Sequence, residues 1–138
     1  PMRIVRLVIC LGYWALLSVL LLVPDPAAIV PIPEVPAFLW SDVGLHFGAF
    51  AVLAVLTYAA RWPQPPGGLL VVLLLAYALA TELLQSLVPC RTVAIEDCAG
   101  NLLGILVATA VYRLVQRAVQ RRCDPAARKA AGEPNPGS

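Results

Sequence analysis

The sequence predicts an all-α polytopic membrane protein built as a bundle of four transmembrane helices. Three observations support this fold class. The 138 residues are 60% hydrophobic and only 13% charged. Their mean hydropathy is +0.82. The apolar residues also fall into four long tracts separated by proline-rich or charged stretches. A water-soluble domain of this length could not cover so much apolar surface, so a soluble fold is excluded.

Each apolar tract approaches the length of about 20 residues that a helix needs to cross the hydrocarbon core. The tracts cover residues 4–23, 43–60, 67–88 and 98–115. The first tract is longer than the apolar core of a secretory signal, so we interpret it as a span. Residues 2–120 then form one membrane domain. Residues 121–138 are charged and then rich in Ala, Gly and Pro, which predicts a disordered tail.

The basic residues predict the orientation of the helices. With four spans, both termini and the 61–66 connection lie on one side, and that side holds every Lys and Arg except Arg91. Because Lys and Arg near helix ends are retained in the cytoplasm, both termini are predicted to be cytoplasmic. The basic stretch 113–129 is explained by this rule and by contact with anionic lipid headgroups. We therefore expect membrane lipids as partners and no nucleic acid; the oligomeric state stays open.

Polar residues recur near one end of three predicted spans. They form three pairs with helical spacing, which places each pair on one helix face. The pairs are Asp42 with His46, Glu82 with Gln85, and Asp97 with Asn101. Arg91 lies in the short connection between the third and fourth spans. All seven residues fall at the extracytoplasmic end in the predicted topology, so they are the candidate site.

Ionisable groups within a bilayer cost roughly 2.5–3.5 kcal/mol each on insertion scales and usually mark function. His46, the only histidine, is the candidate proton carrier, and with Glu82 it forms a candidate catalytic acid–base pair. The candidate ligand-binding residues are Asp42, Gln85, Arg91, Asp97 and Asn101. Structural alternatives remain for each of them. Asp97 can cap the fourth span, and Asn101 and Gln85 can join helices. His46 can be a core residue bonded to Glu82, and Glu82 can form a structural ion pair with Arg91.

Two further patterns concern packing and the cysteines. Gly44 and Gly48, and likewise Gly100 and Gly104, are spaced four apart, which predicts two strips where another helix approaches closely. A disulfide between Cys90 and Cys98 would suit an oxidising outer side, but their spacing leaves it open. No motif for a metal ion or a cofactor is found, so none is predicted.

The polar motifs resemble those of the VanZ-like family of small bacterial membrane proteins. The matching segments are residues 42–47 (DVGLHF), 81–85 (TELLQ), 89–92 (PCRT) and 96–104 (EDCAGNLLG). Two positions depart from the family pattern: Val43 stands where a Lys is common, and Cys90 where a Gly is common. The resemblance implies a multi-pass protein of the bacterial cytoplasmic (inner) membrane. Through the founding member it also implies a link to resistance against the glycopeptide teicoplanin.

Three functions fit this set of residues. In the first, the polar end binds the headgroup of an anionic envelope lipid or a peptidoglycan precursor, with Arg91 on its phosphate or carboxylate. In the second, the protein is an enzyme on an outer-leaflet lipid, with His46 and Glu82 as acid and base and Arg91 stabilising developing charge. In the third, the polar residues only hold the bundle together.

Overall fold

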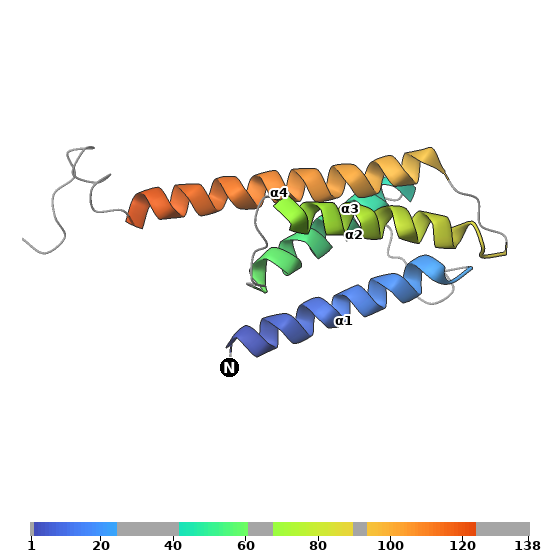
Figure 1. Ribbon diagram of the computed structural model, residues 1–138, viewed down its shortest axis with the longest axis horizontal. Helices are drawn as coiled ribbons and strands as arrows, with labels where there is room; N and C mark the ends of the chain where they lie inside the picture. The colour runs from blue at the N-terminus through green and yellow to red at the C-terminus, as the bar shows by residue number, and fades with distance from the viewer. Residues whose placement is uncertain (1, 25–41, 61–67, 90–93, 124–138) are drawn as a thin grey trace, which may run out of the picture.

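The computed structural model describes residues 2–24, 42–60, 68–89 and 94–123, and within these ranges every regular element is a helix. Figure 1 shows the four helices. Their bounds are α1 (Met2–Leu22), α2 (Asp42–Ala59), α3 (Leu69–Gln85) and α4 (Ile95–Cys123). The predicted all-α class is therefore confirmed.

Three of these helices are long and apolar enough to cross a membrane: α1, α2 and residues Ile95–Arg121 of α4. The third helix, α3, is equally apolar but has 17 residues. At 1.5 Å per residue it is about 25 Å long, near the lower limit for a span. The helices therefore indicate a multi-pass membrane protein.

The fourth helix, α4, extends beyond its predicted bounds at both ends. It begins at Ile95 rather than at residue 98, because Glu96 and Asp97 in its first turn favour the positive end of the helix. It continues to Cys123, since no Pro or Gly interrupts the sequence after Gly104 until Pro125. Residues 121–123 of the predicted tail are thus helical, and residues 124–138 lie outside the described part of the chain.

The second helix, α2, packs most closely against α4. A Cβ atom added at Gly100 would lie 2.7 Å from the carbonyl oxygen of Val43, and one at Gly104 would clash with the backbone of Phe47. The prediction for α4 is therefore confirmed: at Gly100 and Gly104 the backbones of α4 and α2 lie in close contact. The prediction of a close helix approach on α2 is wrong at Gly48, where an added Cβ would meet nothing within 4 Å.

Helix α1 lies to one side of the other three (Figure 1) and contacts α2 and α3. The hydroxyl of Tyr13 donates to the carbonyl of Ala49 at 2.9 Å, and the Ser18 hydroxyl lies 2.8 Å from that of Tyr77. The buried core between the helices is apolar. It consists of Leu17, Leu21, Phe50, Leu53, Ala54, Leu74, Ala78, Ile105 and Ala108.

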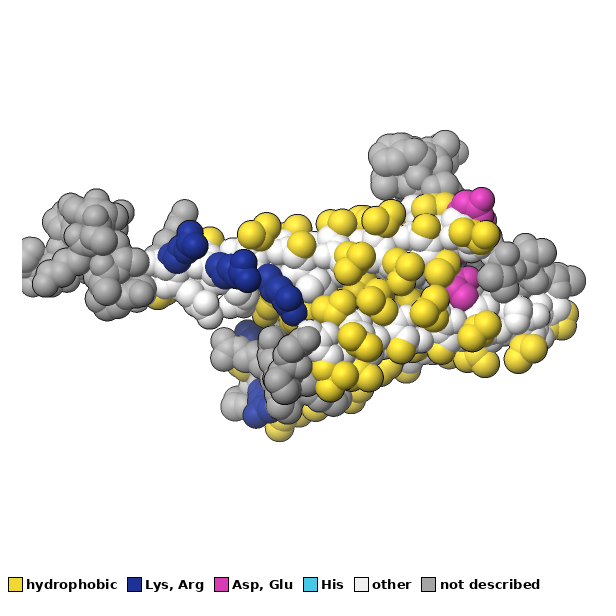
Figure 2. All heavy atoms as spheres, turned by 45° about the horizontal axis from the view of Figure 1, so that its top comes forward, with side chains coloured by type: hydrophobic (Ala, Val, Ile, Leu, Met, Phe, Trp, Pro, Cys, Tyr) yellow, Lys and Arg dark blue, Asp and Glu magenta, His cyan; other side chains and the backbone are white. Residues whose placement is uncertain are grey.

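The surface separates charge from apolar side chains along the bundle. In Figure 2 the Lys and Arg side chains gather at one end and the acids at the other, with a hydrophobic band between them. Large apolar side chains on all four helices are exposed, including Val8, Val72, Leu103 and Val111. An exposed apolar band of this kind suits contact with lipid rather than with water.

Candidate functional site

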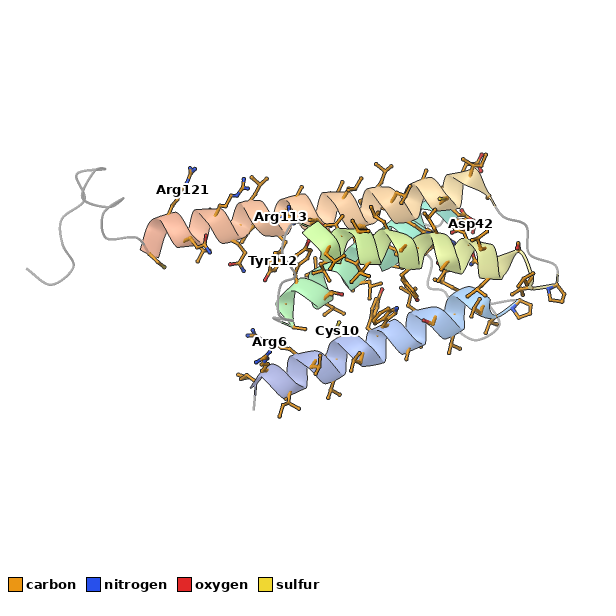
Figure 3. The ribbon with its side chains drawn as sticks, in the orientation of Figure 1. Arg6, Cys10, Asp42, Tyr112, Arg113 and Arg121 are labelled. Carbon is orange, nitrogen blue, oxygen red and sulfur yellow. The ribbon has the colours of Figure 1, made fainter. Side chains whose placement is uncertain are left out.

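Three helix ends bring most of the predicted site residues together. Because the helices alternate in direction, the start of α2, the end of α3 and the start of α4 meet at one end of the bundle (Figure 1). In Figure 3 Asp42 lies at this end, while Arg6, Arg113 and Arg121 lie at the opposite end. The polar residues and the described arginines are thus separated by the length of the apolar core.

Asn101 links His46 to Glu82 inside the bundle. Its Nδ2 donates to Oε1 of Glu82 at 2.6 Å, and its Oδ1 lies 2.9 Å from Nδ1 of His46. Nδ1 of His46 is itself 3.8 Å from Oε1 of Glu82. One side chain from each of α2, α3 and α4 therefore joins a single buried hydrogen-bonded group.

The Asn101 amide also decides which nitrogen of His46 carries a proton. A carboxylate only accepts hydrogen bonds, so the NH₂ group of Asn101 faces Glu82 and the amide oxygen faces His46. The amide oxygen can only accept, so Nδ1 of His46 must donate to it. In the neutral ring, Nε2 then holds the lone pair.

Nε2 of His46 faces Asp97. The distance from Nε2 to Oδ2 of Asp97 is 3.8 Å, which is longer than a hydrogen bond. Side-chain exposure rises along the group, from 5% at Glu82 to 9% at His46 and 17% at Asp97, while Asn101 is fully buried. We call Glu82, Asn101, His46 and Asp97 the polar cluster. Asp97 is where it comes nearest to the surface.

The other predicted site residues lie apart from the polar cluster or outside the described residues. Gln85 is buried, and its Nε2 donates to the backbone carbonyl of Leu21 at 2.9 Å, which ties α3 to the end of α1. Asp42 is exposed in the first turn of α2. Arg91 lies outside the described residues.

The structure bears on two alternatives that the sequence leaves open, the role of Asp97 at the start of α4 and the pairing of Cys98. Helix α4 begins at Ile95, so Asp97 lies within its first turn, where a carboxylate suits the positive end of the helix. Cys98 is a free thiol. Cys90, its possible disulfide partner, lies outside the described residues.

Sequence reasoning missed the polar contacts of α1. The contacts that Tyr13 and Ser18 make with α2 and α3 are half-buried, and no motif distinguishes these residues from lipid-facing ones. The hydrogen-bond acceptor of Gln85 could not be predicted from the sequence either, because it is the backbone carbonyl of Leu21.

Comparison with known proteins identifies the family. The family model described as VanZ/LLP1 matches residues 10–116. The chain belongs to this family. The match includes every candidate site residue, so the resemblance of the polar motifs is confirmed. Neither the curated proteins nor the solved structures gave a match.

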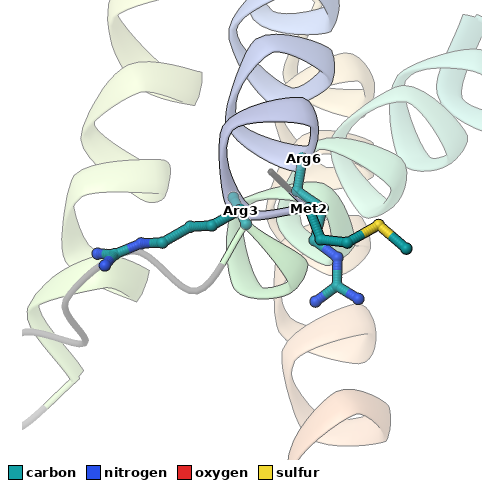
Figure 4. A pocket seen from close by; sticks show the side chains of 4 residues that line it. Met2, Arg3 and Arg6 are labelled. Carbon is teal, nitrogen blue, oxygen red and sulfur yellow. The ribbon is translucent and has the colours of Figure 1, made fainter.

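A cavity of about 280 Å³ lies at the other end of this VanZ/LLP1 protein, lined by Met2, Arg3, Arg6 and Ala60. Figure 4 shows Arg3 and Arg6 pointing in different directions, so their guanidinium groups do not converge on one ligand. Among the described residues, no group of three or more His, Cys, Asp and Glu side chains is placed to hold a metal ion.

Proposed function

We propose that this VanZ/LLP1 protein crosses the cytoplasmic membrane of a bacterium four times, with both termini in the cytoplasm. We propose further that its extracytoplasmic end binds the headgroup of an anionic envelope lipid or a peptidoglycan precursor. The orientation is supported by the described arginines at the ends of α1 and α4, since basic residues are retained in the cytoplasm. Helix α3 would be the shortest span.

The buried polar cluster is the observation that carries the binding proposal. Four polar side chains from three helices are held together at one end of the bundle, beyond its apolar core. Burying them costs free energy that a purely apolar interface would not cost, so their presence favours a function at this end. Asp97, the most exposed member, marks where a headgroup would enter.

Arg91 is the proposed contact for the phosphate or carboxylate of the ligand. It belongs to the connection between α3 and α4, and both of these helix ends lie at the end of the bundle that holds the polar cluster. A guanidinium group suits this role because it pairs with phosphate or carboxylate through two parallel hydrogen bonds.

Lipid co-purification tests the proposal. The wild type and Arg91→Gln are purified from the same bacterial membranes, and the lipids retained per protein are counted by mass spectrometry. We expect Arg91→Gln to lose anionic lipid. Arg113→Gln is the matched control, because it removes an exposed arginine from the other end of the bundle and should retain the lipid. Equal lipid occupancy in all three proteins would contradict the proposal.

Teicoplanin susceptibility is the matching cellular measurement, because the family resemblance links the founding member to resistance. Cells that express the wild type should tolerate more teicoplanin than cells that express Arg91→Gln at equal protein levels. Equal susceptibility would show that Arg91 does not contribute to teicoplanin resistance, and it would leave the binding proposal unaffected.

One observation favours an enzyme as the second candidate. Asn101 orients His46 and leaves Nε2 as a base, and catalytic bases are commonly oriented by a third group in this way. In this reaction Nε2 would take a proton from a water molecule or a hydroxyl group at a lipid headgroup. Proteoliposomes with a lipid labelled in its headgroup test it by measuring release of the label. Release that persists in His46→Ala would remove this candidate.

A further inference from the structure

We infer that the end of α4 is a docking surface for an acidic α-helix of a cytoplasmic partner protein. The surface is residues 113–123, which we call the α4 extension. The inference goes beyond the proposed headgroup site. It rests on the proposed function only for the cytoplasmic side of the α4 extension.

The α4 extension stands clear of the other helices. The ring of Tyr112 stacks on that of Tyr58, next to the last residue of α2, with ring centroids 5.0 Å apart. Helix α2 therefore ends level with Tyr112, and α4 continues from there to Cys123. In Figure 1 it reaches past the ends of the other three helices. Every described side chain from Arg113 onwards is exposed, so the α4 extension is open to contact from outside the bundle.

The length of the α4 extension decides what it can reach. In the sequence Arg61 follows the end of α2, and Arg113 follows Tyr112, so the hydrocarbon core ends near this level. At 1.5 Å per residue the α4 extension is about 16 Å long. The headgroup layer on each side of the hydrocarbon core is only about 5–8 Å thick. Arg113 and Arg117 thus lie at headgroup depth, while Arg121 stands in the cytoplasm beyond it.

Three arginines form a row along the α4 extension. Arg113, Arg117 and Arg121 are four residues apart, so they share one helix face and follow each other at about 6 Å along the axis. Figure 2 shows the dark-blue side chains in a row along this part of the molecule. Among the described residues no acid forms an ion pair with them, and no Asp or Glu follows Asp97 in α4. Like charges at this spacing disfavour the helix, and an anionic partner would relieve that repulsion.

Apolar side chains beside the row favour a helix as the partner. Leu114 and Ala118 are exposed and four residues apart, and Leu114 shares its helix face with Arg117, three residues on. A helix packed on this strip would hold its own residues, repeated every four positions, beside the arginines. Carboxylates with that spacing match the 6 Å repeat of the row and can pair with each guanidinium group. A second copy of this chain does not fit, because its arginines would meet like charge.

Peptide binding tests the inference. The full chain is placed in nanodiscs of phosphatidylcholine, and fluorescence anisotropy measures the binding of two helical peptides of identical composition. In the first peptide Glu recurs every four residues beside Leu, and in the second the same Glu residues are spread around the helix. We expect the first peptide to bind about tenfold more tightly, because only its carboxylates align with the arginine row.

Variants then locate the binding. Arg117→Gln combined with Arg121→Gln should weaken binding of the first peptide about fivefold, since each exposed charge pair contributes modestly. The matched control combines Arg3→Gln with Arg6→Gln, which removes two exposed arginines from α1 at the same end of the bundle and should bind like the wild type. Circular dichroism of each variant confirms that its helices are retained.

The outcomes separate this inference from lipid binding and from the proposed function. Replacing part of the phosphatidylcholine by phosphatidylglycerol should leave the preference for the first peptide in place. Its loss would show that lipid headgroups hold the arginines, which would overturn the inference. Equal binding of the two peptides, or of wild type and the double variant, would also overturn it. Arg91→Gln should bind the first peptide like the wild type even though it loses anionic lipid at the other end.

Photocrosslinking in cells completes the test. A benzophenone amino acid replaces Gln120, which is exposed and lies three residues from Arg117. We expect an adduct with a protein that mass spectrometry shows to contain an acidic helix, and we expect the Arg117→Gln, Arg121→Gln variant at equal expression to lose it. Adducts with lipid alone, or a protein adduct that persists in the double variant, would overturn the inference.

Discussion

Nδ2 of Asn101 donates a 2.6 Å hydrogen bond to Oε1 of Glu82, from a side chain that has no exposed surface. This bond fixes the orientation of the Asn101 amide and, through its oxygen, the proton on His46. A single amide therefore sets the chemistry of the polar cluster.

Asn101→Leu should destabilise the protein more than any other single change in the polar cluster. The substitution keeps the approximate volume but leaves His46 and Glu82 without their shared partner in a buried site. The loss should be about 2–3 kcal/mol, because unsatisfied buried groups cost about 1–3 kcal/mol each and more when charged. Reversible unfolding in mixed detergent measures it.

The comparison for this variant is Leu103→Ala, which changes an exposed residue on the same helix. Its free energy of unfolding should stay within about 0.5 kcal/mol of the wild type. If Asn101→Leu is no less stable than Leu103→Ala, the buried hydrogen bonds of Asn101 do not hold the three helices together.

Gly104→Ala should separate α2 from α4. The added Cβ would clash with the backbone of Phe47, which cannot move aside as a flexible side chain could. We expect a loss of about 1–3 kcal/mol in the free energy of unfolding. Gly48→Ala provides the control within the same helix pair, since its Cβ meets nothing, and it should be neutral or slightly stabilising. Equal effects at the two positions would refute the close approach on α4.

Gln85→Leu should weaken the attachment of α3 to α1 and leave lipid binding unchanged. Its Nε2 is engaged by the carbonyl of Leu21, which makes it a link between helices. Interhelical hydrogen bonds in membranes contribute about 0.6 kcal/mol on average, so the loss of stability should be of that size. Lipid retention measured on the same sample separates the two roles: a severalfold drop would show that Gln85 contacts the ligand.

The two ends of α4 should lie on opposite sides of the membrane. Cys123 is exposed at one end, and Glu96 is exposed near the other. One variant keeps Cys123 as its only cysteine, and a second carries Glu96→Cys as its only cysteine. In intact cells a membrane-impermeant maleimide should label the second variant alone, and Cys123 should react only after permeabilisation. The reverse pattern would invert the proposed orientation.

The sequence was sufficient to predict that polar residues gather at one end of the bundle. Alternating apolar tracts place the start of α2, the end of α3 and the start of α4 together, and helical spacing puts Asp97 and Asn101 on one face. It was not sufficient to predict the pairings. From the sequence Asn101 was a candidate both for ligand binding and for contacts between helices, with helix contacts favoured, because the rotation of each helix about its axis has no signature in a short motif.

The glycines show the same limit. Gly44 with Gly48 and Gly100 with Gly104 share one spacing, yet Gly100 and Gly104 meet the backbone of α2 while Gly48 meets nothing. The glycine spacing indicates that a helix face is flat, but it does not indicate whether another helix packs against that face. The end of α4 was similarly underestimated, since the fall in hydropathy after residue 115 marks the end of an apolar tract and not the end of a helix.

Nitrogen-15 NMR of His46 tests the central claim most directly, because the chain contains a single histidine and its ring signals need no assignment. In protein labelled at the histidine ring nitrogens, Nδ1 should carry the proton and Nε2 should show the signal of a nitrogen with a free lone pair. Asn101→Leu should remove this preference and give a mixture of tautomers. A wild-type spectrum with the proton on Nε2, or on both nitrogens, would contradict the account.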